Sequence, residues 1–195
     1  MNSAVILAGG MSRRMGRDKL VLEVDGRMLL ESAVCRFSGE FDNVYLSVAD
    51  VGKYPDVEAD RIVDILPGAG PMSGVHAALT NLPGDGAFFV AADLPYACPR
   101  AARRISELCA DHDASIIRLS DGKLEPLFGY YRKAMLPRCT DMIKSGDYRM
   151  TELVLRMNTL FLAPADLGAL WNDKLILNIN TPCDYEQVVL AKATD

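Results

Sequence analysis

Short apolar runs alternate with stretches of helical periodicity along the whole chain. The apolar runs are four to eight residues long and end at turn signals, as buried strands do. They predict strands over residues 4–8, 43–48, 61–66, 87–92, 114–119, 124–131 and 159–163. Apolar positions that recur every three or four residues predict helices instead. These helices cover residues 28–37, 76–82, 99–110, 132–144 (with Pro137 as the expected break), 150–157 and 182–193.

This alternation predicts an α/β fold. Strands that alternate with helices form right-handed βαβ crossovers, which build a mostly parallel sheet covered by helices on both faces. A length of 195 residues suits one such domain, and the chain has no internal repeat, low-complexity tract or linker. We therefore expect one three-layer, Rossmann-like domain over residues 1–195.

The first predicted strand ends abruptly in Gly9 and Gly10. Glycines at this point allow backbone N–H groups to approach an anion closely. The residues that follow include four cations and a single carboxylate, Asp18. The cations are Arg13, Arg14, Arg17 and Lys19. Clustered positive charge after a glycine turn favours a polyphosphate ligand, although an ordinary strand-to-loop turn with solvated basic residues is the alternative.

Spacing excludes two common phosphate-binding loops at this point. A Walker loop needs Gly-x-x-x-x-Gly-Lys-Ser/Thr, whereas five residues separate Gly10 from Gly16 and Arg17-Asp18 follow. A dinucleotide fingerprint needs Gly-x-Gly-x-x-Gly, and residues 9–12 do not supply it. An NAD-type oxidoreductase is therefore disfavoured.

The segment LAGGMSRRMGRDK resembles the signature LAGG-x-S-x-RMG-x-DK of the small nucleotidyltransferases. Within that family it is most similar to the molybdenum cofactor guanylyltransferases of the MobA type. The resemblance implies a fold of the nucleotidyltransferase type and a nucleotide held by this segment. The residues it assigns to nucleotide binding here are Leu7, Ala8, Gly9, Gly10 and Lys19.

A second loop, PGAGPMSG over residues 67–74, resembles the family's P-G-x-G-P-x-x-G loop. It precedes the helix expected from His76, whose N-terminus could meet an anion. The resemblance makes Asp64 a nucleotide-binding residue, and its carboxylate could accept from N1–H and N2–H₂ of guanine together. A structural role in capping the loop is the alternative for Asp64. Where the family usually has a nucleotide-binding asparagine, this chain has Ser47, so that contact is not transferred.

The strongest buried strand, residues 87–92, ends in Asp93-Leu94-Pro95. An acid at the carboxyl end of a central strand lies where open α/β sheets bind ligands. The sequence resembles the family's A-D-x-P motif, whose aspartate binds Mg²⁺. We therefore expect Asp93 to hold Mg²⁺ through one oxygen while nucleotide phosphates and water complete the octahedron. A helix N-cap is the alternative role.

Residues 178–185 closely match the family's N-x-NTP-x-D motif. Thr181 as N-cap, Pro182 in the first position and Asp184 in the first turn predict the start of the last helix. Capping does not require Asn180, which we therefore expect to contact the acceptor or support the site. Arg149, in a region that lies near the pterin substrate in the family, could meet a phosphate or be a solvated helix charge.

Composition narrows the partners further. A net charge of −5 provides no broad basic face for nucleic acid, and no apolar run reaches the ~18 residues of a membrane span. The five cysteines are widely spaced and form no CxxC pair, as in reduced cytoplasmic proteins. Only two histidines are present, so a histidine-rich metal centre is disfavoured. These features predict a cytoplasmic enzyme without a membrane segment.

Together the residues and the resemblance imply transfer of GMP from GTP to the phosphate of molybdopterin, with release of pyrophosphate. Lys19, Arg14 and Asp93 would carry the catalysis, with residues 1–95 binding the nucleotide and 96–195 the acceptor. Molybdenum cofactor delivery proteins are further candidate partners. Gly10 favours guanine, because the related cytidylyltransferases tend to read LAAG. Three alternatives remain: molybdopterin cytidylyltransferase, a sugar- or isoprenoid-phosphate nucleotidyltransferase, and a non-catalytic GTP-binding regulator.

Overall fold

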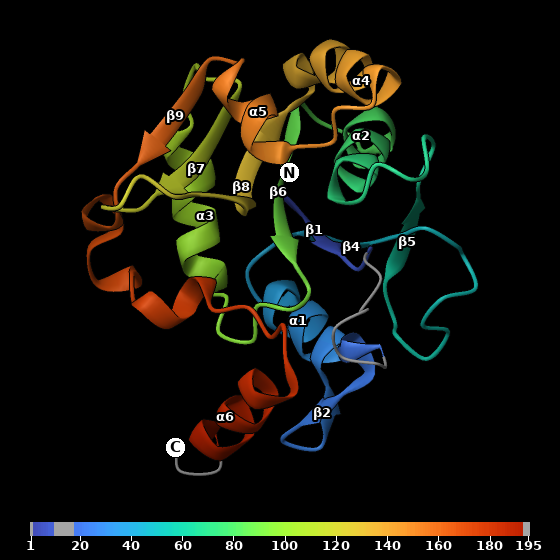
Figure 1. Ribbon diagram of the computed structural model, residues 1–195, viewed down its shortest axis with the longest axis vertical. Coiled ribbons are helices and arrows are strands. Elements are labelled where there is room, and N and C mark those ends of the chain that lie inside the picture. The colour runs from blue at the N-terminus through green and yellow to red at the C-terminus, as the bar shows by residue number, and fades with distance from the viewer. Residues whose placement is uncertain (1, 10–17, 193–195) are drawn as a thin grey trace.

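A seven-stranded sheet forms the centre of the molecule in a computed structural model that describes residues 2–9 and 18–192 (Figure 1). The strand order is β5-β4-β1-β6-β8-β7-β9, and β8 runs antiparallel to both of its neighbours while the other pairs are parallel. The strands are β1 (Ser3–Leu7), β4 (Asn43–Val48), β5 (Asp60–Val63), β6 (Gly86–Ala91), β7 (Ala114–Arg118), β8 (Leu124–Arg132) and β9 (Thr159–Leu162). The predicted three-layer α/β fold with a mostly parallel sheet is confirmed.

Helices cover both faces of the sheet. Figure 1 places α1 (Leu29–Ser38) and α3 (Pro99–Leu108) below the sheet. Above it lie α2 (Pro71–Asn81), α4 (Leu136–Ser145) and α5 (Met150–Leu155). Within the described residues, no helix combines the length and the apolar character that a bilayer crossing requires.

The remaining elements are short or lie beside the sheet. A hairpin of β2 (Glu23–Val24) and β3 (Arg27–Met28) turns through Asp25 and Gly26, both at positive φ, and α6 (Pro182–Lys192) packs beside it. Side chains such as Leu22, Leu29 and Val188 form a small core between these elements and α1. Short 3₁₀ helices cover Lys19–Val21, Lys133–Met135, Pro164–Leu170 and Asp173–Ile176.

Each face of the sheet has its own apolar core, because successive strand residues point to opposite sides. Phe88 of β6 packs below the sheet, with its ring centroid 6.4 Å from that of Phe37 in α1. Its neighbour Phe89 packs above, edge to face with Tyr131 at 5.6 Å. Both phenylalanines are fully buried. Strand β6 is therefore the central support of both layers, and it ends two residues before Asp93.

The chain changes direction between β1 and β6. From β1 it proceeds outward to β4 and β5, and then returns to the other side of β1 at β6. Loops that leave two such neighbouring strands in opposite directions open a crevice at their carboxyl ends, where α/β sheets bind ligands. The segment after β1 and the Asp93 turn after β6 both lie at this point.

Three element boundaries differ by three residues or more from those predicted. Helix α2 begins at Pro71 rather than His76, since proline is well tolerated in the first helical position and Gly70 precedes it at φ 59°. Strand β5 ends at Val63 rather than Leu66. Pro137 lies in the first turn of α4 instead of breaking a longer helix, because residues up to Arg132 continue β8. The connection from β5 to α2 thus covers residues 64–70.

Helix α2 approaches the sheet closely at Gly74. A Cβ built on Gly74 would lie 2.3 Å from the Ser47 hydroxyl oxygen and 2.9 Å from a Leu7 methyl carbon. Both distances are too short for atoms that are not bonded. The absence of a side chain at Gly74 therefore allows α2 to lie against the ends of β1 and β4.

We expect the G74A variant to lose about 1–3 kcal/mol of unfolding free energy, because overpacking forces its neighbours to shift. Urea denaturation would measure the loss. The matched control is G39A, where the nearest atom to the new methyl group would be a carbonyl oxygen at 3.7 Å. Adding S47A should restore part of the loss, since it removes the nearer obstacle. A G74A variant as stable as G39A would contradict this packing.

Candidate active site

An ion pair between Lys19 and Asp93 lies at the crevice between β1 and β6. The Lys19 Nζ is 2.5 Å from Oδ2 of Asp93, and both side chains are 17% exposed. Lys19 opens the 3₁₀ helix that follows the first loop, and Asp93 follows the last residues of β6. The structure therefore brings together two residues, 74 positions apart, that the sequence analysis assigned to one ligand.

The C-terminal segment joins this pair. The Ile179 N–H donates to the Asp93 carbonyl at 3.0 Å, and the Ile179 carbonyl accepts from Lys19 Nζ at 2.9 Å. Lys19 also donates to Oδ1 of Asn180 at 3.4 Å. Segments from the start, the middle and the end of the chain thus meet at the Lys19 ammonium group.

A cleft of about 390 Å³ opens at this junction. Its walls include Leu7 and Gly9 from the end of β1, Pro71 from the start of α2, and the Asp93 turn. Further lining residues come from the second half of the chain. They are Leu127, Asn178 and Asn180. Both halves of the sequence therefore contribute to one site.

One of the two carboxylate oxygens of Asp93 is available to a ligand. Its Oδ2 accepts from Lys19, whereas Oδ1 is buried and has no hydrogen-bond partner within residues 2–9 and 18–192. A buried carboxylate oxygen without a partner is costly unless something compensates it. A hard cation with phosphate and water as its other ligands suits one such oxygen. Among the described residues, no group of three or more His, Cys, Asp or Glu side chains is arranged to hold a metal ion.

Asn180 is positioned by the helix cap that follows it. Oδ2 of Asp184 accepts from the N–H groups of Asn180 and Thr181 at 2.8 and 2.7 Å, and the Asp184 N–H donates to the Thr181 hydroxyl. These backbone hydrogen bonds lower the pKa of Asp184, so its carboxylate stays ionised. The predicted cap is confirmed, and it fixes the backbone of the cleft residue Asn180.

Gly9 lines the cleft, yet packing does not require a glycine there. A Cβ at this position would have no described atom within 4 Å, and the φ of Gly9 lies outside the left-handed region. Its neighbour Ala8 is buried, and its N–H donates to the Ser47 carbonyl at 3.0 Å. The predicted site residues Gly10 and Arg14 lie outside the described residues.

Asp64 lies at the same edge of the sheet, but the described walls of the cleft do not include it. It follows β5, two strands away from β1, and is half-buried. Burial raises the pKa of Asp64 to about 6, because the ionised form loses hydration. Ser47, at the end of β4, is 2% exposed and packs against α2. Ser47 is not among the described residues that line the cleft.

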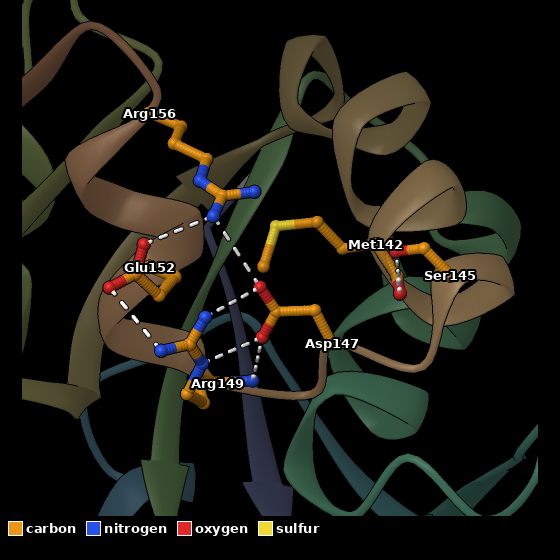
Figure 2. A network of polar contacts seen from close by, with 6 residues as sticks. All are labelled: Met142, Ser145, Asp147, Arg149, Glu152 and Arg156. Atoms are coloured by element: carbon orange, nitrogen blue, oxygen red, sulfur yellow. Dashed lines mark hydrogen bonds and ion pairs between the residues drawn. The ribbon is translucent and has the colours of Figure 1, made fainter.

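Arg149 takes part in a charge network at the start of α5 (Figure 2). Its guanidinium donates two hydrogen bonds to the Asp147 carboxylate, at 2.9 and 3.0 Å. Arg156 and Glu152 complete the network with contacts of 3.2–3.5 Å. Hydrogen bonds from Arg149 lower the pKa of Asp147 to about 2. Two cations and two carboxylates balance in this network.

Two residues that contribute to the site were not predicted from the sequence. Asn178 lines the cleft beside Asn180, and the two-residue spacing of N-x-N in an extended segment could have indicated it. Arg36 of α1 donates to the carbonyl oxygens of Leu94 (3.1 Å) and Pro95, and so holds the turn that carries Asp93. No sequence signal points to a contact between an arginine and main-chain carbonyls.

Comparison with known proteins places this geometry among nucleotidyltransferases. The family model described as the MobA-like NTP transferase domain matches residues 4–160. A protein of Methanosarcina mazei named probable molybdenum cofactor guanylyltransferase is 31% identical, with 96% of this chain and 89% of the relative covered. A protein of Pelotomaculum thermopropionicum with the same name is 33% identical, covering 93% of this chain and 89% of the relative.

A solved structure shares the whole architecture. The crystal structure of molybdopterin-guanine dinucleotide biosynthesis protein A from Archaeoglobus fulgidus superposes with a TM-score of 0.88 at 25% sequence identity. The match covers 100% of both chains. The similarity therefore includes the C-terminal segment that carries Asn178 and Asn180, which lies beyond the part matched by the family model.

Proposed function

The chain belongs to the MobA-like NTP transferase family, and from this premise we propose that it is a molybdenum cofactor guanylyltransferase. It transfers GMP from GTP to molybdopterin and so forms molybdopterin guanine dinucleotide. The names of its relatives and of its structural neighbour support this activity. The contact between Lys19 and Asp93 inside a cleft built from both halves of the chain is the structural observation that carries the proposal.

The reaction is an in-line displacement at phosphorus. An anionic oxygen of the molybdopterin phosphate bonds to the α-phosphorus of GTP, and the bond between that phosphorus and the β-bridging oxygen breaks. Pyrophosphate leaves with the electron pair. The attacking oxygen is already ionised, so no side chain has to remove a proton. Neither histidine is in a position to do so: His76 contacts Thr140 on α4 at 3.1 Å, and His112 contacts the Cys109 carbonyl at 3.0 Å.

Catalysis then consists of positioning and charge neutralisation. Lys19 binds phosphate oxygens, Arg14 adds a second cation, and the main chain of Leu7, Ala8, Gly9 and Gly10 lies along the nucleotide. Asp93 holds Mg²⁺, which when bound offsets the negative charge of the triphosphate. Oδ1 of Asp93, which has no hydrogen-bond partner among the described residues, supports this role.

In this proposal the acceptor lies against the lining residues that come from the second half of the chain. Asn180 contacts it or supports the site, residues 1–95 bind the nucleotide, and residues 96–195 bind the acceptor. GTP and molybdopterin are the substrates, and delivery proteins that carry the pterin are further partners. The enzyme works in the cytoplasm, a location that the five free cysteines suit.

The D93A variant should lose turnover by a factor of at least about 10²–10³, as when one charge-stabilising group is removed from an active site. Its fold should persist, because Lys19 keeps acceptors on Ile179 and Asn180. Pyrophosphate release with molybdopterin and GTP measures the loss, and D141A, an exposed change in α4, is the control. Turnover in D93A equal to that of D141A would remove Asp93 from the reaction.

The same assay with GTP, CTP and ATP tests the nucleotide. Activity confined to GTP is the expected result. Activity confined to CTP would make the protein a cytidylyltransferase. Activity with another phosphorylated acceptor but not with molybdopterin would indicate a different member of the fold. GTP binding without turnover would indicate a regulator.

The pH dependence of GTP use should reveal the role of Asp64. If its carboxylate accepts from guanine, only the ionised form binds the base, and its raised pKa of about 6 places the loss of that form between pH 7 and pH 5. The KM for GTP should therefore rise about tenfold over this interval as the ionised fraction falls. The D64N variant has no carboxylate at this position, so any change of its KM with pH comes from other groups. The tenfold rise should therefore be absent from D64N. Identical pH profiles for the two proteins would exclude Asp64 as the guanine acceptor.

A further inference from the structure

The carboxylate next to Lys19 has two hydrogen-bond donors. Oδ1 of Asp18 accepts from the Leu20 N–H at 3.1 Å and so caps the 3₁₀ helix that begins with Lys19. Oδ2 of Asp18 accepts from the Tyr54 hydroxyl at 2.8 Å. Tyr54 is 36 positions away, in the loop between β4 and β5. A contact with a distant loop therefore anchors the chain at the residue before Lys19.

The loop that carries Tyr54 is itself held firmly. Tyr54 has φ of 55°, in the left-handed region that a bulky side chain rarely adopts. Such a conformation persists only where its surroundings determine it. Here the Arg61 guanidinium of β5 donates to the carbonyl oxygens of Tyr54, Val57 and Ala59, at 2.7, 3.2 and 3.3 Å. The Tyr54 ring also packs against the core below the sheet. The hydroxyl is thus presented to Asp18 from a rigid support.

The hydroxyl remains a donor across the working pH range. Burial and the contact with Asp18 raise the pKa of Tyr54, so its proton is retained. A neutral hydroxyl that donates to a carboxylate forms a charge-assisted hydrogen bond, which is stronger and more directional than a neutral one. The position of Asp18 is therefore defined on both of its oxygens.

We propose that Tyr54 is a positioning residue for Lys19, acting through Asp18. The Lys19 ammonium must lie where a triphosphate meets Asp93, and its contacts with Asp93 and Ile179 constrain only the tip of the side chain. Tyr54 constrains the other end by fixing the backbone from which Lys19 extends. The proposal rests on the proposed role of Lys19 as a phosphate contact.

The test compares Y54F, D18A, the double variant and K19A by steady-state kinetics of pyrophosphate release. Y54F keeps the ring and removes only the hydroxyl. We expect kcat/KM for GTP to fall about 10- to 100-fold in Y54F, because even a small displacement of a catalytic group lowers the reaction rate strongly. The KM for molybdopterin should stay unchanged. The double variant should match D18A, since residues that act as one unit are not additive.

The matched control is Y131F. It also removes one hydroxyl hydrogen bond, to the Pro126 carbonyl, but in the core above the sheet. It should lower the melting temperature and leave kcat/KM for GTP unchanged. A Y54F variant with normal kinetics, or Y54F and D18A effects that multiply, would overturn the proposal, as would equal losses for both substrates.

The result for K19A distinguishes the positioning role of Tyr54 from the proposed function on which that role rests. If K19A retains normal turnover, the role of Lys19 in the proposed function fails. If K19A loses turnover and Y54F does not, the function stands and the positioning role of Tyr54 is wrong.

Discussion

The ion pair between Lys19 and Asp93 joins the segments that form the cleft. Its two residues come from loops after different strands, and those loops meet only because β1 and β6 are parallel neighbours at the point where the chain reverses direction. The C-terminal segment closes the arrangement through Ile179, which binds Asp93 with its N–H and Lys19 with its carbonyl. The sheet order therefore determines the site before any side chain is considered.

Each member of the pair is supported by a group that does not line the cleft. Arg36 holds the turn after Asp93 by donating to main-chain carbonyls, and Tyr54 holds Asp18 beside Lys19. Both supports come from segments that pack against the core below the sheet. In the proposed reaction, supports at both ends of the pair would limit the reorganisation needed to stabilise charge on the phosphates.

Local sequence patterns predicted the elements well and the contacts between them only in part. Glycines after an apolar strand and an acid after β6 indicated the two central segments, because strand ends are visible in the sequence. The start of α2 was misplaced, since a segment rich in proline and glycine suggests a loop even where Pro71 can begin a helix. The roles of Arg36 and Tyr54 could not be predicted. No sequence pattern shows that an arginine will bind main-chain carbonyl oxygens, or that a tyrosine will adopt a left-handed backbone conformation.

In the proposed reaction, Lys19 and Asp93 hold one triphosphate jointly. A crystal structure of the protein with a non-hydrolysable GTP analogue and Mg²⁺ would test this arrangement. We expect phosphate oxygens within hydrogen-bonding distance of Lys19 Nζ, with the metal on Oδ1 of Asp93. A nucleotide bound elsewhere, with Lys19 and Asp93 contacting only each other, would contradict it.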